Sequence, residues 1–159
     1  MARIVLLSCT KAKLDKPSPA QELYSPSPMF QKTKAYGETL KPDKTFILSA
    51  KHHLVPMEKE LEPYDLTLKN MKKDEKEQWG ETVISQMNDR GIKPESDTFI
   101  FLAGSEYIKP LKDHIPEENI ENPMQGKRMG ERLSWLNKQV ENLKEIFNSL
   151  KQRIYEILK

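Results

Sequence analysis

The sequence predicts a three-layer α/β domain, in which helices flank a small, mostly parallel sheet of about four strands, followed by a long C-terminal helix. Apolar runs of strand length alternate with segments of helical periodicity, and these runs lack the polar alternation of a half-exposed strand. A heptad pattern of apolar residues then continues to the C-terminus. The chain has 159 residues, which suits one domain of ordinary size.

Strands are predicted where the sequence is nearly continuous in β-branched, aromatic or leucine residues. Three such runs are Arg3–Ser8, Thr45–Ser49 and Thr98–Ala103, and a fourth short strand is expected around Asn119–Glu121. Strands without polar alternation are buried on both faces, which is typical of a parallel sheet under helices. The segment Lys16–Pro28, rich in proline and serine, is expected to be an ordered loop.

Helices are predicted between these strands. Pro28–Leu40 begins with a proline, which suits the first helical position, and Lys72–Arg90 is followed by Gly91, where a helix should stop. A third helix is expected over Ser105–Asp113, where Pro110 should limit it to about one turn before a kink or restart.

The C-terminal segment carries apolar residues at alternating spacings of four and three, which predicts one long helix. We call these residues the heptad seam: Met129, Leu133, Leu136, Val140, Leu143, Phe147, Leu150, Ile154 and Ile157. The first part of the helix is expected to pack on an α/β domain of residues 1–137, with residues 138–159 as a helical extension. Two interpretations remain open: the seam docks on its own domain, or it forms a coiled coil with a second copy, giving a homo-oligomer.

Composition excludes several classes of protein. No apolar run approaches the length of a membrane span, and the apolar N-terminus is too short for a signal peptide, so we expect no membrane association. The single cysteine excludes an intramolecular disulfide and a cysteine-cluster zinc site, and a reducing cytoplasm is the expected location. A net charge of +2 is too small to argue nucleic-acid binding from bulk charge, although a local basic patch remains compatible with it.

Polar residues capable of chemistry follow the predicted strands. The first strand leads into Ser8–Lys13, the second into Ser49–His53, the third into Gly104–Tyr107, and the last helix opens with Gln125–Gly130. Ligands bind at the carboxyl ends of parallel strands, so these segments should share one rim. That rim would attract an anion such as a phosphate through its cations: Lys11, Lys13, Lys51, Lys127 and Arg128.

Backbone N–H groups at Gly104 and Ser105 could also bind that anion, because they lie at a strand-to-helix junction. The chain contains neither a Walker-type phosphate loop nor a G-x-G-x-x-G motif, so a standard nucleotide loop is not supported. Lys51, just past a buried strand, has two interpretations: a ligand-binding cation or a member of a surface salt bridge. Ser8 and Ser49 end the first two strands and are candidate ligand-binding residues.

Each remaining candidate also has a structural interpretation. Asp65 is the best general-base candidate, and it could equally cap a turn. Cys9 fits a small buried hydrophobe better than a nucleophile. His52 has no partner in a metal-ligand motif, so we expect no metal and no cofactor. Tyr24 and Tyr107 could stack on a base or lie at the edge of the core.

The same segments resemble an uncharacterised domain family of bacteria and phages, distantly similar to YaaA-type peroxide-stress proteins. His53 departs from the pattern, because glycine is common there. The resemblance covers roughly residues 3–137, in order, through Cys9, Lys13–Asp15, Pro19–Ala20, Leu23–Tyr24, Phe30, Leu48–Leu54, Pro63–Leu68, Phe101–Gly104, Tyr107, Gly126–Gly130, Leu133 and Trp135–Asn137.

The resemblance implies a ligand and a reaction. Related domains occur beside enzymes of modified-base metabolism, and the layout is similar to uracil-DNA-glycosylase-like folds. This implies a nucleoside, nucleotide or nucleic-acid ligand, and cleavage or exchange of an N-glycosidic bond. Asp65 would stabilise the oxocarbenium-like state or activate water, while Lys51, Lys13 and Arg128 would hold phosphate or the leaving base. The alternatives are a non-catalytic binder using the same rim and an oligomeric interaction protein.

Overall fold

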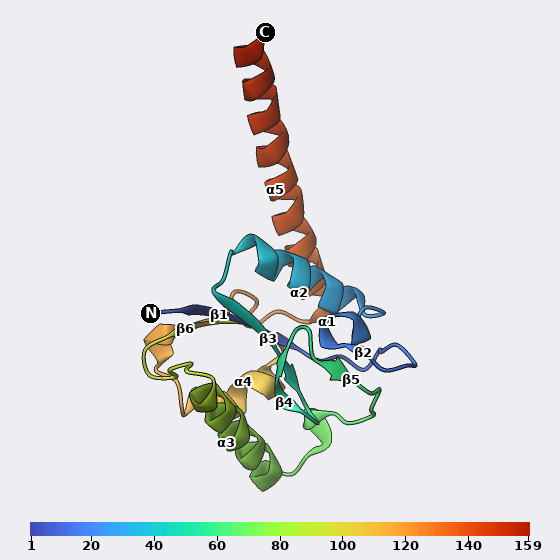
Figure 1. The fold of residues 1–159 in the computed structure, drawn as a ribbon, viewed down its shortest axis with the longest axis vertical. Helices are drawn as coiled ribbons and strands as arrows, with labels where there is room; N and C mark the ends of the chain where they lie inside the picture. The colour runs from blue at the N-terminus through green and yellow to red at the C-terminus, as the bar shows by residue number, and fades with distance from the viewer. The chain divides into compact units, whose positions relative to one another are not determined.

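The computed structural model describes all 159 residues, which form two compact units, Met1–Gln125 and Gly126–Lys159. The first unit is the predicted α/β domain. Its five-stranded sheet has the order β4-β3-β1-β6-β7, in which only β4 runs antiparallel to its neighbour. The second unit holds α5 (Met129–Leu158), a single uninterrupted helix of 30 residues (Figure 1). The predicted fold class is therefore confirmed, and the sheet has one strand more than expected.

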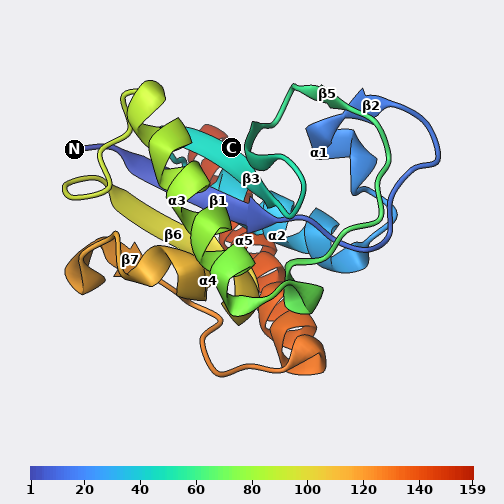
Figure 2. The same ribbon diagram turned by 90° about the horizontal axis from the view of Figure 1, so that it is seen from below.

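The central strands follow the apolar runs of the sequence. β1 (Arg3–Ser8) lies between β3 (Lys44–Ser49) and β6 (Thr98–Leu102), parallel to both (Figure 2). In β1 the side chains of Ile4–Leu7 are all fully buried, as a strand covered on both faces requires. The short β7 (Ile120–Glu121) pairs with β6 in the place expected for a fourth strand.

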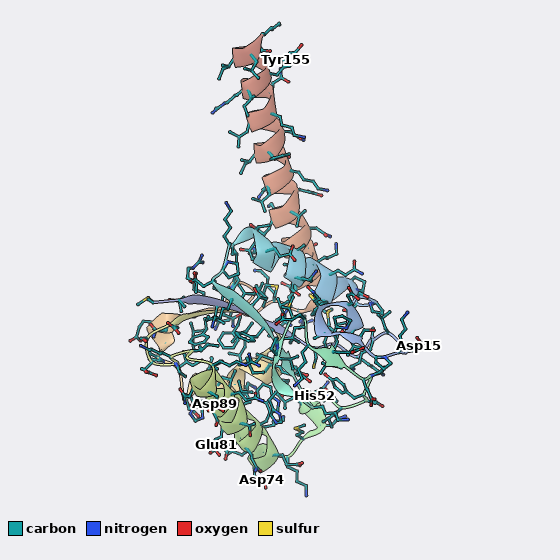
Figure 3. All side chains as sticks on the ribbon, in the orientation of Figure 1. Asp15, His52, Asp74, Glu81, Asp89 and Tyr155 are labelled. Atoms are coloured by element: carbon teal, nitrogen blue, oxygen red, sulfur yellow. The ribbon has the colours of Figure 1, made fainter.

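Helices cover both faces of the sheet, which gives the three layers. α2 (Pro28–Thr39) lies over one face, and α3 (Lys73–Asp89) with α4 (Ser105–Lys112) covers the other (Figures 1 and 2). Ser27 caps α2, since its hydroxyl accepts from the Phe30 N–H at 3.2 Å. Exposed acidic residues are spread along α3, at Asp74, Glu81 and Asp89 (Figure 3).

The prediction that Pro110 restricts the third helix to about one turn is wrong. α4 continues through Pro110 without a break. A proline costs one backbone hydrogen bond and a steric conflict, and close packing against α3 offsets this loss. Gly80 of α3 permits the approach, because a Cβ there would lie 2.6 Å from the Pro110 carbonyl oxygen.

Three short strands and one short α-helix were not predicted from the sequence. The segment expected to be a loop at 16–28 contains β2 (Ser18–Pro19), which pairs with β5 (Glu60–Leu61), and the short helix α1 (Ala20–Leu23). The chain also turns back after β3 to form the antiparallel edge strand β4 (His53–Pro56).

His53, the first residue of β4, sits in the left-handed region at φ 66°, directly after the turn that joins β3 to β4. This conformation favours glycine, which is the residue common there in the resemblance above. The turn forms with histidine in place, so the departure from the pattern does not prevent it.

Candidate functional site

A pocket opens where β1 ends. Cys9 extends the sheet by one residue, because its N–H donates to the Leu48 carbonyl at 2.9 Å, and the chain then leaves the sheet. The pocket has a volume of about 470 Å³ and continues to α4 and the 3-10 turn η1 (Leu68–Asn70). We call it the Cys9 pocket; its lining is Cys9, Thr10, Lys11, Lys13, Asp65, Leu66, Thr67, Asn70 and Tyr107.

Cys9, the residue after β1, contacts Tyr107 of α4, the helix that follows β6. The Cys9 Sγ lies 3.1 Å from the Tyr107 Oη, within hydrogen-bonding distance for sulfur. Burial, and then the neighbouring Cys9, raises the pKa of Tyr107, so its hydroxyl stays protonated at neutral pH and can donate to the sulfur.

Trp79 connects this pair to the end of β3. Its ring meets Tyr107 edge-on at 5.7 Å, and its Nε1–H donates to the Ser49 carbonyl at 2.9 Å. Cys9 after β1, Ser49 at the end of β3 and Tyr107 of α4 are therefore linked, through Trp79 of α3, at one edge of the sheet, as expected for parallel strands.

A chain of hydroxyl groups lies behind the pocket. The Tyr64 Oη is 2.7 Å from the Ser49 Oγ and 2.6 Å from the Tyr24 Oη. The Ser49 Oγ also accepts the His52 N–H at 3.0 Å, and in each of the two hydroxyl pairs either oxygen can be the donor. Burial raises the pKa of Tyr24 to about 12 and raises that of Tyr64 as well, so these phenols act as neutral hydrogen-bonding groups and not as bases.

Lys13 is the half-buried cation of the Cys9 pocket. Its Nζ lies 4.5 Å from the centre of the Tyr64 ring, 5.9 Å from that of Tyr24, and donates to the Lys11 carbonyl at 3.3 Å. Burial lowers the pKa of Lys13, while the charges of Cys9 and Asp65 oppose that shift. The ion pairs of the chain do not include Lys13, so its charge is available to a ligand.

The structure brings most of the predicted site residues together. Cys9, Lys11, Lys13, Asp65 and Tyr107 line the Cys9 pocket. Tyr24 and Ser49 lie behind it and are linked through Tyr64. Ser8, the last residue of β1, is half-buried and immediately precedes the pocket.

Other predicted residues lie away from the pocket lining. Lys51 is an exposed residue of the turn between β3 and β4. Gly104 and Ser105 begin α4, and Ser105 is exposed. Arg128 belongs to the second unit, where it precedes α5 and its N–H donates to the Glu131 Oε1 at 3.3 Å.

His52 lies on a different surface, beside β4 (Figure 3). Its ring meets the Tyr64 ring edge-on at 5.4 Å, and it also faces a separate pocket of about 320 Å³ near Lys59 and Gln86. Burial lowers the pKa of His52, and the charges of Lys51, Lys59 and His53 lower it further.

The sequence interpretation missed Tyr64 and several pocket residues. Tyr64 immediately precedes Asp65 in a proline-containing turn, so an aromatic beside a candidate carboxylate was the available signal. Thr67 and Asn70 come from the connection between β5 and α3, whose path across the strand ends is not encoded in any local pattern.

The structure contains no group of three or more His, Cys, Asp or Glu side chains that could hold a metal ion. No helix combines the length and the apolar character that a membrane crossing requires.

Comparison with known proteins identifies the domain. Neither the curated proteins nor the solved structures contain a significant match to the chain. A family model does match residues 4–138, which span nearly all of the α/β unit and the first turns of α5. The chain therefore belongs to DUF6884, a family of unknown function.

Proposed function

We propose that the Cys9 pocket binds a nucleoside or nucleotide and that the protein cleaves or exchanges its N-glycosidic bond. One observation carries this proposal: Asp65 and the cations Lys11 and Lys13 line a single pocket of about 470 Å³. This volume lies within the range of small-molecule sites, which is roughly 300–1,000 Å³. The resemblance to YaaA-type and glycosylase-like proteins supports the choice of ligand and of bond.

In this proposal Asp65 is the catalytic carboxylate. Breaking an N-glycosidic bond builds positive charge on the sugar, and a carboxylate beside it can stabilise that charge or remove a proton from attacking water. Asp65 is exposed on the pocket wall, where a bound sugar could reach it.

Lys13 is the cation that binds the phosphate or steadies the leaving base. It takes this role in preference to Lys51, because Lys13 lines the pocket and Lys51 lies on an exposed turn. Tyr107 presents an aromatic ring on the same wall, which suits contact with a base.

The test is release of free base from a panel of nucleosides and nucleotides, followed by chromatography. Asp65→Asn should reduce turnover by about 10²- to 10⁴-fold, the usual contribution of a general acid or base, with ligand affinity nearly unchanged. Asp15→Asn is the matched control, because Asp15 is an exposed carboxylate of the loop after β1 and does not line the pocket (Figure 3). Full turnover in Asp65→Asn would contradict the role of Asp65.

One observation favours a non-catalytic binder as the second candidate. No hydrogen bond within the protein holds the Asp65 carboxylate, whereas catalytic groups are usually fixed by neighbouring residues. A binder would retain the nucleotide in calorimetry without releasing base. Its affinity would fall steeply with salt if the ligand is a nucleic acid, because several phosphates must be neutralised. Lys13→Ala should then weaken binding, and Asp65→Asn should not.

A further inference from the structure

The C-terminal part of α5 presents an apolar face. Its members in the heptad seam are well exposed: Leu143 39%, Phe147 58%, Leu150 49%, Ile154 56% and Ile157 81%. The neighbouring Ile146 and Leu158 are 57% and 79% exposed. Contiguous apolar surface of this kind usually marks an interaction site. It lies outside residues 4–138, the part of the chain that the family model matches.

The composition of this face favours pairing with one parallel helix. In heptad notation Val140, Phe147 and Ile154 occupy a positions, and Leu143, Leu150 and Ile157 occupy d positions, two of which are leucine. β-Branched residues at a, combined with leucine at d, favour a parallel coiled coil of two strands. Two of the three a positions are β-branched.

The charges beside the seam are all positive. The flanking e and g positions hold Lys144, Lys151 and Arg153. Lys151 leans toward the seam, with its Nζ 4.6 Å from the centre of the Phe147 ring. The acidic residues of this segment lie on the remaining positions, away from the seam: Glu141, Glu145 and Glu156.

A second copy supplies no counter-charge for these cations. In a parallel pair, each g position faces an e position five residues further along the partner. Lys144 would then face Gln139, Lys151 would face Ile146, and Arg153 would face Leu158. An antiparallel pair would set e against e, and therefore lysine against lysine. Salt bridges between e and g positions decide which helices pair. A pair of two copies of this helix would form none of these salt bridges.

We propose that α5 pairs through residues 140–158 with a parallel helix of another protein, which carries an apolar heptad seam flanked by Glu or Asp. Such a partner would bury the exposed apolar face and place carboxylates opposite Lys144, Lys151 and Arg153. This pairing is independent of the Cys9 pocket and of its ligand.

The test uses the full-length protein and two synthetic helical peptides with the same Val/Leu seam, one with Glu and the other with Lys at every e and g position. By fluorescence anisotropy at low salt, the acidic peptide should bind at least about tenfold more tightly than the basic one. The difference should shrink as salt rises, because exposed charges are screened over about 10 Å at 0.1 M salt.

Charge reversal tests the role of the flanks. Lys144→Glu with Lys151→Glu should transfer the preference to the basic peptide. Lys138→Glu with Lys159→Glu is the matched control, because it makes the same change in net charge at f positions, away from the seam. The control should keep the preference for the acidic peptide.

Several results would overturn the proposal. One is a stable dimer of the full-length protein in light scattering at micromolar concentration, which would assign the face to a second copy. Another is equal binding, or no binding, of the two peptides. A third is binding to vesicles containing phosphatidylserine with no binding of the acidic peptide, which would assign the face to a membrane surface.

Discussion

The apolar residues of β1 and those of the C-terminal part of α5 have opposite environments. Ile4–Leu7 of β1 are fully buried between two strands and two helical layers, whereas Phe147, Leu150 and Ile154 of α5 are 49–58% exposed. Both sets follow a regular apolar pattern in the sequence. The difference teaches that a pattern predicts an element and its apolar face, but not what covers that face. Within the first unit the sheet and helices cover each other, and α5 presents a face suited to a partner.

The largest expected effect is a loss of stability that should occur for the buried residues of β1 and not for the exposed residues of α5. Leu6 is fully buried, and in the sheet it lies beside Phe46 of β3 and Phe101 of β6. Leu6→Ala should lower the free energy of unfolding by about 2–5 kcal/mol, because it leaves a cavity in the core. Leu150→Ala, at a side chain 49% exposed, should change it by about 0.5 kcal/mol or less. Urea denaturation measures both, and equal losses would show that the heptad seam is buried in the free chain.

An intermediate effect is expected for the tyrosine hydroxyls. Tyr64→Phe removes the group that bridges Ser49 and Tyr24, and should cost about 1–3 kcal/mol because it leaves a buried hydroxyl unpaired. Tyr155→Phe is the matched change near the end of α5, where the ring is 62% exposed, and should be nearly neutral (Figure 3). Thermal unfolding compares them, and a neutral Tyr64→Phe would show that the hydroxyl chain contributes little to stability.

The smallest effect concerns pH and is confined to the first unit, which holds all 3 histidines of the chain. Burial lowers the pKa of His52 and of His53 below the ordinary value of 6.5. The unfolded chain therefore takes up protons first as pH falls. The stability of the first unit should decline as pH drops through about 6.5, and the loss is complete below the folded-state pKa values.

His52→Gln should reduce this slope of stability against pH, and the same change at exposed His114 serves as the control. Chemical denaturation between pH 7.5 and 5 measures the slopes. A slope that is the same in wild type and His52→Gln would contradict the assignment to His52.

Local patterns predicted the parts of the molecule that depend on neighbours in sequence. Arg3–Ser8 was predicted to the residue, and the helices near Pro28 and Lys73 to within one or two residues. The edge strand β4 was missed, because its turn places His53 at a positive φ that histidine seldom adopts. Pro110 was misread, because only the contact with Gly80 shows why the helix continues there.

The amino-acid sequence alone determined the fold class, the alternation of strands and helices, and the gathering of Cys9, Ser49 and Tyr107 at the carboxyl edge of the sheet. It could do so because strand direction follows from burial pattern, and parallel strands end on the same side. Tertiary structure decided that Lys13 and Asp65 share a pocket from which Lys51 is absent, and that Tyr64 links Tyr24 to Ser49. The physical reason is that long loops are placed by packing between residues distant in the chain, which no local periodicity records.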